Sequence, residues 1–157
     1  MGIRKDWQNL SPFLVRRMGE AGWTADVKKD IPTTLEENSI PLESIDTVVW
    51  SHWHWDHIGD MSRLPPSTDL VVGPGFTRVI IPGFPTNNDS PVLESDYSGR
   101  KLIELVDMTP TVAGFPSFDL FGDGSFYLLH TPGHAVGHLS GLVRTTLQNS
   151  HAGETLC

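Results

Sequence analysis

The stretch that decides the fold is Ser51-His52-Trp53-His54-Trp55-Asp56-His57-Ile58-Gly59-Asp60, in which histidine and aspartate side chains are densely clustered. Directly before it, residues 46–50 (DTVVW) form a short β-branched run that is typical of a buried strand. Side chains alternate along an extended segment, so His52 and His54 are expected on the same side of the chain. Asp56 and His57 follow the strand end, where the chain must turn toward Gly59.

This cluster predicts a metal site. Imidazole and carboxylate groups together suit zinc, and they also suit iron or manganese. We interpret His52 and His54 as ligands of one ion, and Asp56 and His57 as ligands of a second. Polar groups buried without partners cost roughly 1–3 kcal/mol each, so an unpaired cluster beside three Trp residues would make a poor core. The alternative, a solvated loop that happens to be rich in histidine, is disfavoured.

A third ligand is expected from another strand end. Residues 130–138 (HTPGHAVGH) provide one, because His134 follows a Pro-Gly turn at the end of a predicted strand over residues 125–130. Such a turn would project the side chain off the edge of the sheet. His130 and His151, taken singly, are interpreted as ordinary surface or core histidines.

The rest of the chain alternates short strand and helix signals. Ser11 and Pro12 predict a helix start with a stop at Gly19, and Thr33 with Glu36 predicts a capping box for a helix through Asn38. Asp123-Gly124 between apolar runs predicts a two-residue hairpin turn. Further strands are predicted at residues 69–72, 78–81, 101–106 and 139–143. This order favours an α/β or α+β sandwich over an all-helical fold.

The charge composition disfavours two classes of binding partner. The 157 residues carry 11 Lys and Arg against 19 Asp and Glu, a net charge of −8, which argues against a nucleic-acid partner and against an anionic membrane surface. No apolar run approaches the roughly 18 residues of a spanning helix, and the first ten residues do not read as a secretory signal. The lone Cys157 fits a reducing compartment, so a cytoplasmic location is expected. The oligomeric state is not predicted.

Residues 51–60 resemble the H-x-H-x-D-H motif of the metallo-β-lactamase superfamily, and residues 131–138 (TPGHAVGH) resemble its downstream T-P-G-H-x-x-G-H element. Residues 2–7 (GIRKDW) and 121–127 (FGDGSFY) are similar to its lactonase-like, fungal-type branch. The resemblance extends over residues 2–147. It implies a four-layer αββα sandwich, with two mixed β-sheets flanked by helices and metals at one edge of the sheets.

The resemblance also implies roles for individual residues. His52, His54 and His134 would bind the first metal, and Asp56 and His57 would supply part of the second site. His138 resembles a residue that lies behind the ligands and orients an imidazole without binding the metal. Zn²⁺ is the expected cofactor, with one or two ions in the family. Trp55 and Tyr127 are candidate pocket walls, although ordinary packing is the favoured interpretation of both.

The chain also departs from the family pattern. The bridging Asp and the last His of the second metal site are not found, and after Val143 the tail offers only Glu154 and His151. We therefore expect residues 1–147 to be an incomplete domain of this type and residues 148–157 an atypical tail. One tightly bound metal or fewer is predicted, together with low stability that metal would raise.

The expected function is a zinc-dependent hydrolase acting on a small-molecule ester or lactone carbonyl. Asp56 would act either as a ligand or as the base that orients the attacking water. Two alternatives stay open: an inactive metal-binding remnant, and a mononuclear iron oxygenase of the same fold. A nuclease is disfavoured by the charge of −8.

Overall fold

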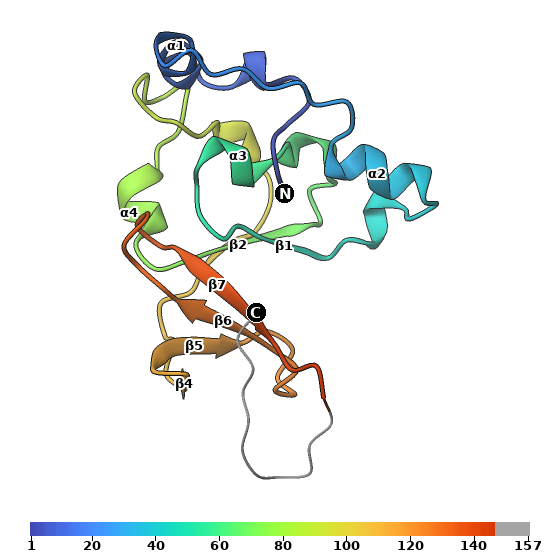
Figure 1. The fold of residues 1–157 in the computed structure, drawn as a ribbon, viewed down its shortest axis with the longest axis vertical. Coiled ribbons are helices and arrows are strands. Elements are labelled where there is room, and N and C mark those ends of the chain that lie inside the picture. The colour runs from blue at the N-terminus through green and yellow to red at the C-terminus, as the bar shows by residue number, and fades with distance from the viewer. Residues whose placement is uncertain (147–157) are drawn as a thin grey trace.

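Two β-sheets organise residues 1–146, the part of the chain that this computed structural model describes (Figure 1). The first sheet is parallel, in the order β1-β2-β3, and consists of β1 (Thr47–Val49), β2 (Asp69–Val72) and β3 (Leu102–Glu104). The second is antiparallel, in sequence order, and consists of β4 (Thr111–Val112), β5 (Phe115–Asp119), β6 (Phe126–His130) and β7 (Leu139–Val143). Parallel strands require long crossovers, whereas antiparallel neighbours can follow one another through short connections.

The helices lie on the face of the first sheet that points away from the second sheet (Figure 1). The α-helices are α1 (Pro12–Glu20), α2 (Ile31–Glu37), α3 (Trp55–Ile58) and α4 (Phe76–Ile80). Single 3-10 turns are η1 (Trp7–Asn9), η2 (Leu42–Ser44), η3 (Met61–Arg63) and η4 (Glu94–Asp96). The crossover from β1 to β2 contains α3, and the crossover from β2 to β3 contains α4.

Two apolar cores follow from the alternation of side chains along the first sheet. Val48 and Leu70 point to the helical side, where they pack with Trp50, Ile58, Met61, Phe76 and Ile80. Val49 and Val71 point to the other side, where they pack against residues of the second sheet that include Leu128 and Leu139. Within residues 1–146 the architecture is therefore helices, sheet, sheet.

These features confirm the expected mixed α/β class with two sheets. The prediction that each sheet is itself mixed is wrong for residues 1–146, because the first sheet pairs only in parallel and the second only antiparallel. The connections between strands explain why neither sheet is mixed, because helical crossovers link the strands of the first sheet and turns and loops link those of the second. The predicted tail at residues 148–157 lies outside the described residues.

The predicted start of α1 is confirmed, since the Ser11 side chain accepts a hydrogen bond from the Leu14 amide and Pro12 opens the helix. The helix ends one residue after Gly19. For α2 the predicted cap is wrong. Asp30, not Thr33, caps this helix, and its carboxylate accepts from the Thr33 amide at 3.0 Å.

Two other local predictions are corrected by tertiary contacts. Residues 78–81 were expected to form a strand, but α4 occupies this region because Glu104 accepts hydrogen bonds from the amides of Gly75 and Thr77 and so caps its first turn. The hairpin between β5 and β6 has a loop longer than two residues. Asp119 closes that loop by accepting from the amides of Gly122 and Gly124.

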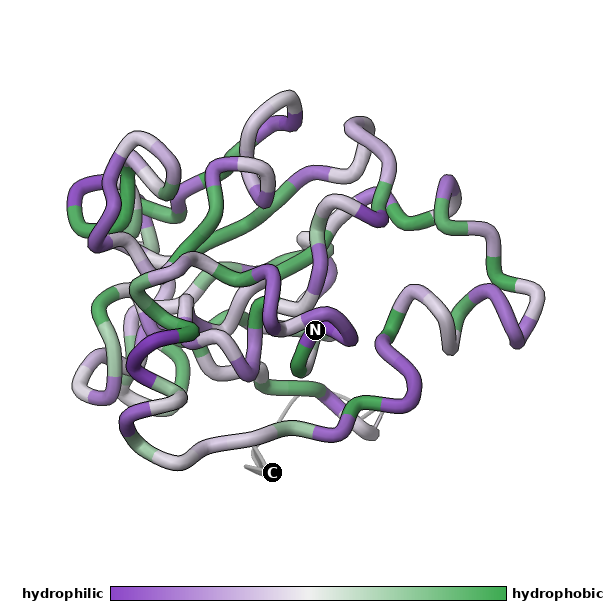
Figure 2. Tube along the Cα trace, turned by 90° about the horizontal axis from the view of Figure 1, so that it is seen from above, coloured by the Kyte–Doolittle hydropathy of each residue, from purple (hydrophilic) through white to green (hydrophobic). Residues whose placement is uncertain are grey.

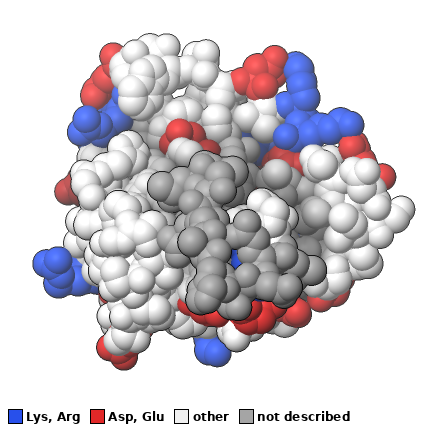
Figure 3. Space-filling view, turned by 60° about the horizontal axis from the view of Figure 1, so that its bottom comes forward, with Lys and Arg blue, Asp and Glu red and all other residues white. Residues whose placement is uncertain are grey.

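Hydrophobic and hydrophilic residues alternate in short stretches along the described trace (Figure 2). None of the helices within residues 1–146 is long and apolar enough to cross a membrane. On the face shown in Figure 3, Lys and Arg side chains lie close to Asp and Glu side chains. The described ion pairs agree with this interspersed pattern, for example Arg63 with Asp30 at 2.9 Å and Lys29 with Glu37 at 2.7 Å.

Candidate metal centre

His52 and His54 lie in the extended segment that continues β1. The Trp50 amide still bonds to the Val71 carbonyl at 2.9 Å, so the chain leaves the sheet only after residue 50. His54 keeps an extended backbone and forms the N-cap of α3. The two imidazoles therefore reach the same side of the segment, as the alternation predicts, with ring centres 4.7 Å apart.

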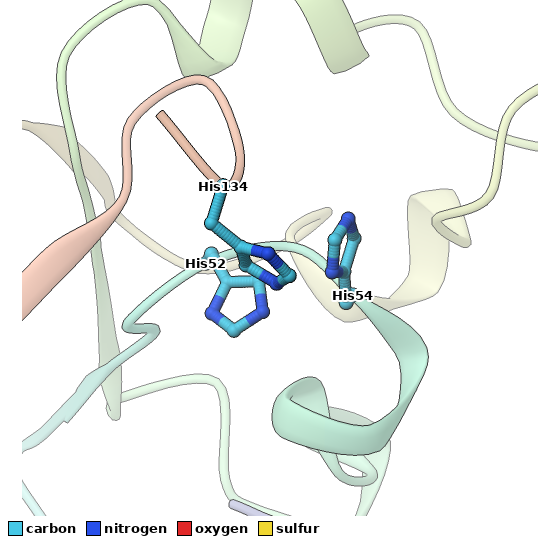
Figure 4. A group of neighbouring side chains, drawn as sticks. All are labelled: His52, His54 and His134. Carbon is cyan, nitrogen blue, oxygen red and sulfur yellow. The ribbon is translucent and has the colours of Figure 1, made fainter. Parts of the chain in front are cut away.

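His134 reaches this pair from the second sheet. It lies in the loop between β6 and β7, which the Thr131 amide closes by a 3.0 Å hydrogen bond to the His138 carbonyl. The His134 ring centre is 4.8 Å from that of His52 and 4.6 Å from that of His54. One ligand atom from each of the three histidines lies within 4.8 Å of the others (Figure 4). We call His52, His54 and His134 the histidine trio.

The chemistry of the trio fits a metal ion. His52 is buried, its Nδ1 lies 3.2 Å from the Ser51 hydroxyl, and its Nε2 has no hydrogen-bond partner among the described residues. The pKa of His52 is lowered to about 4, mainly by burial and to a smaller extent by repulsion from the neighbouring histidines. Burial and His134 also lower the pKa of His54. Both imidazoles are thus held neutral, which is the form that binds a metal.

Asp56 and His57 lie on α3 beside the trio. The His57 ring centre is 4.3 Å from that of His52, and its Nε2 is 3.3 Å from Asp56 Oδ2. Both side chains are about half exposed. Among residues 1–146, however, the trio is the group of potential ligands whose atoms are mutually close enough to share an ion. A second metal at Asp56 and His57 stays a prediction.

His138 lies behind the trio. Its ring centre is 5.0 Å from that of His52, and its Nδ1 is 2.8 Å from the Thr131 hydroxyl, which in turn contacts Ser140. This pairing fixes the His138 ring at the base of the loop that carries His134. His130 pairs with Leu139 in the sheet and does not belong to the trio. His151 and Glu154 lie outside the described residues.

Comparison with known proteins identifies the family. Residues 20–144 match the sequence pattern of the metallo-beta-lactamase superfamily. The chain belongs to this superfamily. The match confirms the superfamily resemblance carried by residues 51–60 and 131–138.

Named relatives of this metallo-beta-lactamase chain include two lactamases. It is 48% identical over 149 residues to gamma-lactamase FDB1 of Fusarium pseudograminearum, covering 93% of this chain and 36% of that protein. It is also 48% identical over 149 residues to gamma-lactamase MBL2 of Gibberella moniliformis, covering 93% and 62%. The chain thus spans less than two thirds of the length of either relative.

A solved structure of an N-acyl homoserine lactone hydrolase, with N-hexanoyl-L-homoserine at its catalytic metal centre, has the same fold. The TM-score is 0.56 at 16% identity, and the match covers 76% of this chain and 41% of that one. At this identity the similarity supports the fold alone. Together with the family match, it supports the assignment of the fold.

A cavity of about 800 Å³ opens beside the histidine trio. His54 and His134 line it, and aromatic side chains from α1, the loop after α1 and the residues around α3 form much of its wall: Phe13, Trp23, Trp53 and Trp55. Trp55 was a candidate wall residue and does line the cavity, whereas Tyr127 is not among its lining residues. Sequence reasoning missed Phe13 and Trp23, which lie more than 30 positions from Trp55 and gave no local signal.

Proposed function

We propose that this chain carries the metal-binding part of a hydrolase that opens a cyclic ester or amide. The observation that carries the proposal is the histidine trio with its buried, unpartnered His52 Nε2. A buried ring nitrogen without a partner is costly, and a metal ligand bond would satisfy it. The gamma-lactamase names of the two relatives, together with the lactonase-like resemblance of residues 2–7 and 121–127, support the cyclic carbonyl as the substrate group.

Zn²⁺ is the proposed ion, because three imidazoles plus an open position is a common ligand set of catalytic zinc. When bound there, zinc would make an attacking water more acidic and polarise the substrate carbonyl. His52 would be the rigid ligand, since it is buried and tied to Ser51, and His134 would be the exposed one. An open side at His134 leaves room for a substrate.

Asp56 is the proposed proton acceptor. It lines the cavity together with His54 and His134, and its Oδ2 is held 3.3 Å from His57 Nε2. A carboxylate in that place can orient the attacking water and take its proton. The aromatic cavity walls would hold the apolar part of the substrate and exclude bulk water from the reacting carbonyl.

The test is zinc binding followed by turnover. Purified protein should bind about one tight equivalent of zinc by elemental analysis, and a chromophoric chelator should compete for it. His54→Ala should weaken binding by a factor of about 100 or more, while the control His130→Ala should leave it unchanged. Zinc binding that His54→Ala does not alter would contradict the proposal. Hydrolysis of a lactone and lactam panel, lost in Asp56→Asn with zinc still bound, would assign the reaction.

A non-catalytic zinc-binding protein is the second candidate. The specific observation in its favour is that, within residues 1–146, Asp56 and His57 do not complete a second group of mutually close ligands. Two-metal sites stabilise both attacking and leaving oxygens, so one ion supplies less of that chemistry. Tight binding at the trio without turnover of any lactone or lactam would favour this candidate.

A further inference from the structure

We propose that Gly73 is a positioning residue for His134, because its missing side chain lets the loop of His134 rest directly on the end of β2. The inference rests on the proposed function, since it concerns how the third member of the trio is brought to the other two. Gly73 lies outside the histidine motifs. Its effect would act through Gly137, three residues after His134.

The contact joins two backbones. A Cβ atom at Gly73 would overlap the carbonyl oxygen of Gly137 and would lie 2.7 Å from its carbonyl carbon. In the reverse direction, a Cβ at Gly137 would lie 2.9 Å from the Gly73 carbonyl oxygen. Real Cβ atoms do not approach backbone atoms this closely, so any side chain at Gly73 must push the two segments apart. Only glycine gives the observed separation.

The same loop meets the turn after β2 at a second point. A Cβ at Gly75 would lie 2.9 Å from Val136 Cγ1, so the Gly73-Pro74-Gly75 turn contacts both Val136 and Gly137. This turn is itself held, because Glu104 on β3 accepts hydrogen bonds from the Gly75 and Thr77 amides. The turn therefore acts as a fixed support for the loop.

The other side of the loop is anchored to the segment of His52. The Leu139 amide donates a 2.7 Å hydrogen bond to the Ser51 carbonyl, directly before His52. With Leu139 held there, an outward push on Gly137 must be absorbed by the loop that precedes it. That loop carries His134, whose side chain is exposed. A displaced Gly137 would thus move His134 away from the pair.

The test uses three glycine-to-alanine variants with ordinary backbone angles. Gly73→Ala meets the Gly137 backbone. Gly83→Ala meets the Val92 carbonyl oxygen at 2.8 Å, which is not part of the loop that carries His134, and Gly19→Ala meets nothing within 4 Å. Zinc affinity is measured by chelator competition, with the folded fraction of each variant determined by circular dichroism. We expect Gly73→Ala to weaken zinc binding 10- to 100-fold per folded molecule, the range seen when residues that orient ligands are changed. Gly83→Ala and Gly19→Ala should bind as the parent does.

The inference is overturned if folded Gly73→Ala binds zinc as tightly as the parent, or if Gly83→Ala loses affinity by the same factor. Should Gly73→Ala fail to fold, Gly137→Ala replaces it, with Gly22→Ala as its control. Both positions have positive φ, of 73° and 69°, but only Gly137 has a neighbour in contact. Equal affinity of these two variants would also overturn the inference. A parent protein that binds no zinc through His54 would instead refute the proposed function, and this inference with it.

Discussion

Asp96 is a carboxyl group with no exposed surface and no hydrogen-bond partner for either oxygen among the described residues. Three charged side chains surround it: Arg4, Asp60 and Arg100. Arg4 forms ion pairs with Asp6 at 2.8 Å and with Asp60 at 3.4 Å. The terminal nitrogens of Arg100 donate hydrogen bonds to backbone carbonyls of the loop around η3. Burial, reinforced by Asp60, raises the pKa of Asp96 to about 7 against the opposing effect of Arg4 and Arg100.

Asp96→Asn should therefore stabilise the protein at alkaline pH. Between pH 4 and 7 the folded state holds a proton on Asp96 that the unfolded state has lost, so stability should fall as pH rises through this window and stay low above it. Asn is neutral and similar in size, and it removes that cost. We expect the free energy of unfolding to rise by about 2 kcal/mol at pH 8 and hardly at pH 4. Urea unfolding of Asp96→Asn and of the parent across this pH range measures the difference in the free energy of unfolding.

Asp107→Asn is the matched control, because Asp107 is exposed and makes no ion pair among the described residues. Its stability profile should follow that of the parent. If Asp96→Asn destabilises the protein equally at pH 5 and pH 8, the Asp96 carboxyl has a partner that only an anion satisfies. No local sequence pattern predicts this cluster, because Arg4, Asp60 and Asp96 are brought together only by the tertiary fold.

At the scale of elements, α2 depends on one buried carboxylate. The Asp30 carboxylate accepts a hydrogen bond from the Thr33 amide. It also forms an ion pair with Arg63, whose Nη1 donates hydrogen bonds to the two carboxylate oxygens at 2.9 and 3.1 Å. Burial alone would raise the pKa of Asp30, but the bonds from Thr33 and Arg63 outweigh it and hold the pKa below its ordinary value. The stability that Asp30 contributes should consequently be present at neutral pH and be lost in acid, as pH falls through its lowered pKa.

Asp30→Ala should lower the free energy of unfolding by about 2 kcal/mol at pH 7, since it removes a cap and leaves Arg63 without its main partner. Asp30→Asn should cost less, because Asn caps helices nearly as well. Thr33→Ala, which removes only a hydroxyl that accepts from Arg63, should cost least. Urea titrations of the three variants give the order. A larger loss of unfolding free energy in Thr33→Ala than in Asp30→Ala would indicate that the predicted capping box, and not Asp30, starts α2.

The local predictions that are confirmed depend on neighbouring residues, whereas those that are wrong depend on residues far away in the sequence. The start of α1 and the strands β2 and β7 follow from residues next to one another in sequence, namely a Ser-Pro cap and β-branched or apolar runs. Residues 78–81 are predicted as a strand, but residues 78–80 belong to the helix Phe76–Ile80. The prediction fails because Glu104, the side chain that caps this helix, lies in a strand nearly 30 residues later. Likewise, both histidine segments were predicted from their motifs, but the Gly73 support beneath the second was not.

At the scale of the molecule, the histidine trio joins the two sheets. His52 and His54 leave the first sheet after β1, while His134 leaves the second sheet after β6. An ion held by all three would close a loop of about 80 residues and link layers that otherwise contact each other through the apolar core around Val71 and Leu128. Metal should consequently matter to the stability of the whole domain as well as to chemistry.

Zinc should raise the melting temperature of the protein by mass action, because the trio is assembled only in the folded state. At a free zinc concentration 100 times the Kd, the gain is about 2.7 kcal/mol, or roughly 5–10 °C for a domain of this size. A chelator should reverse the shift, and His54→Ala should show little of it, whereas His130→Ala should respond as the parent does. Differential scanning fluorimetry with zinc and chelator measures all three. An identical melting temperature with zinc and with chelator would mean that no ion links the sheets, even though the three imidazoles lie together.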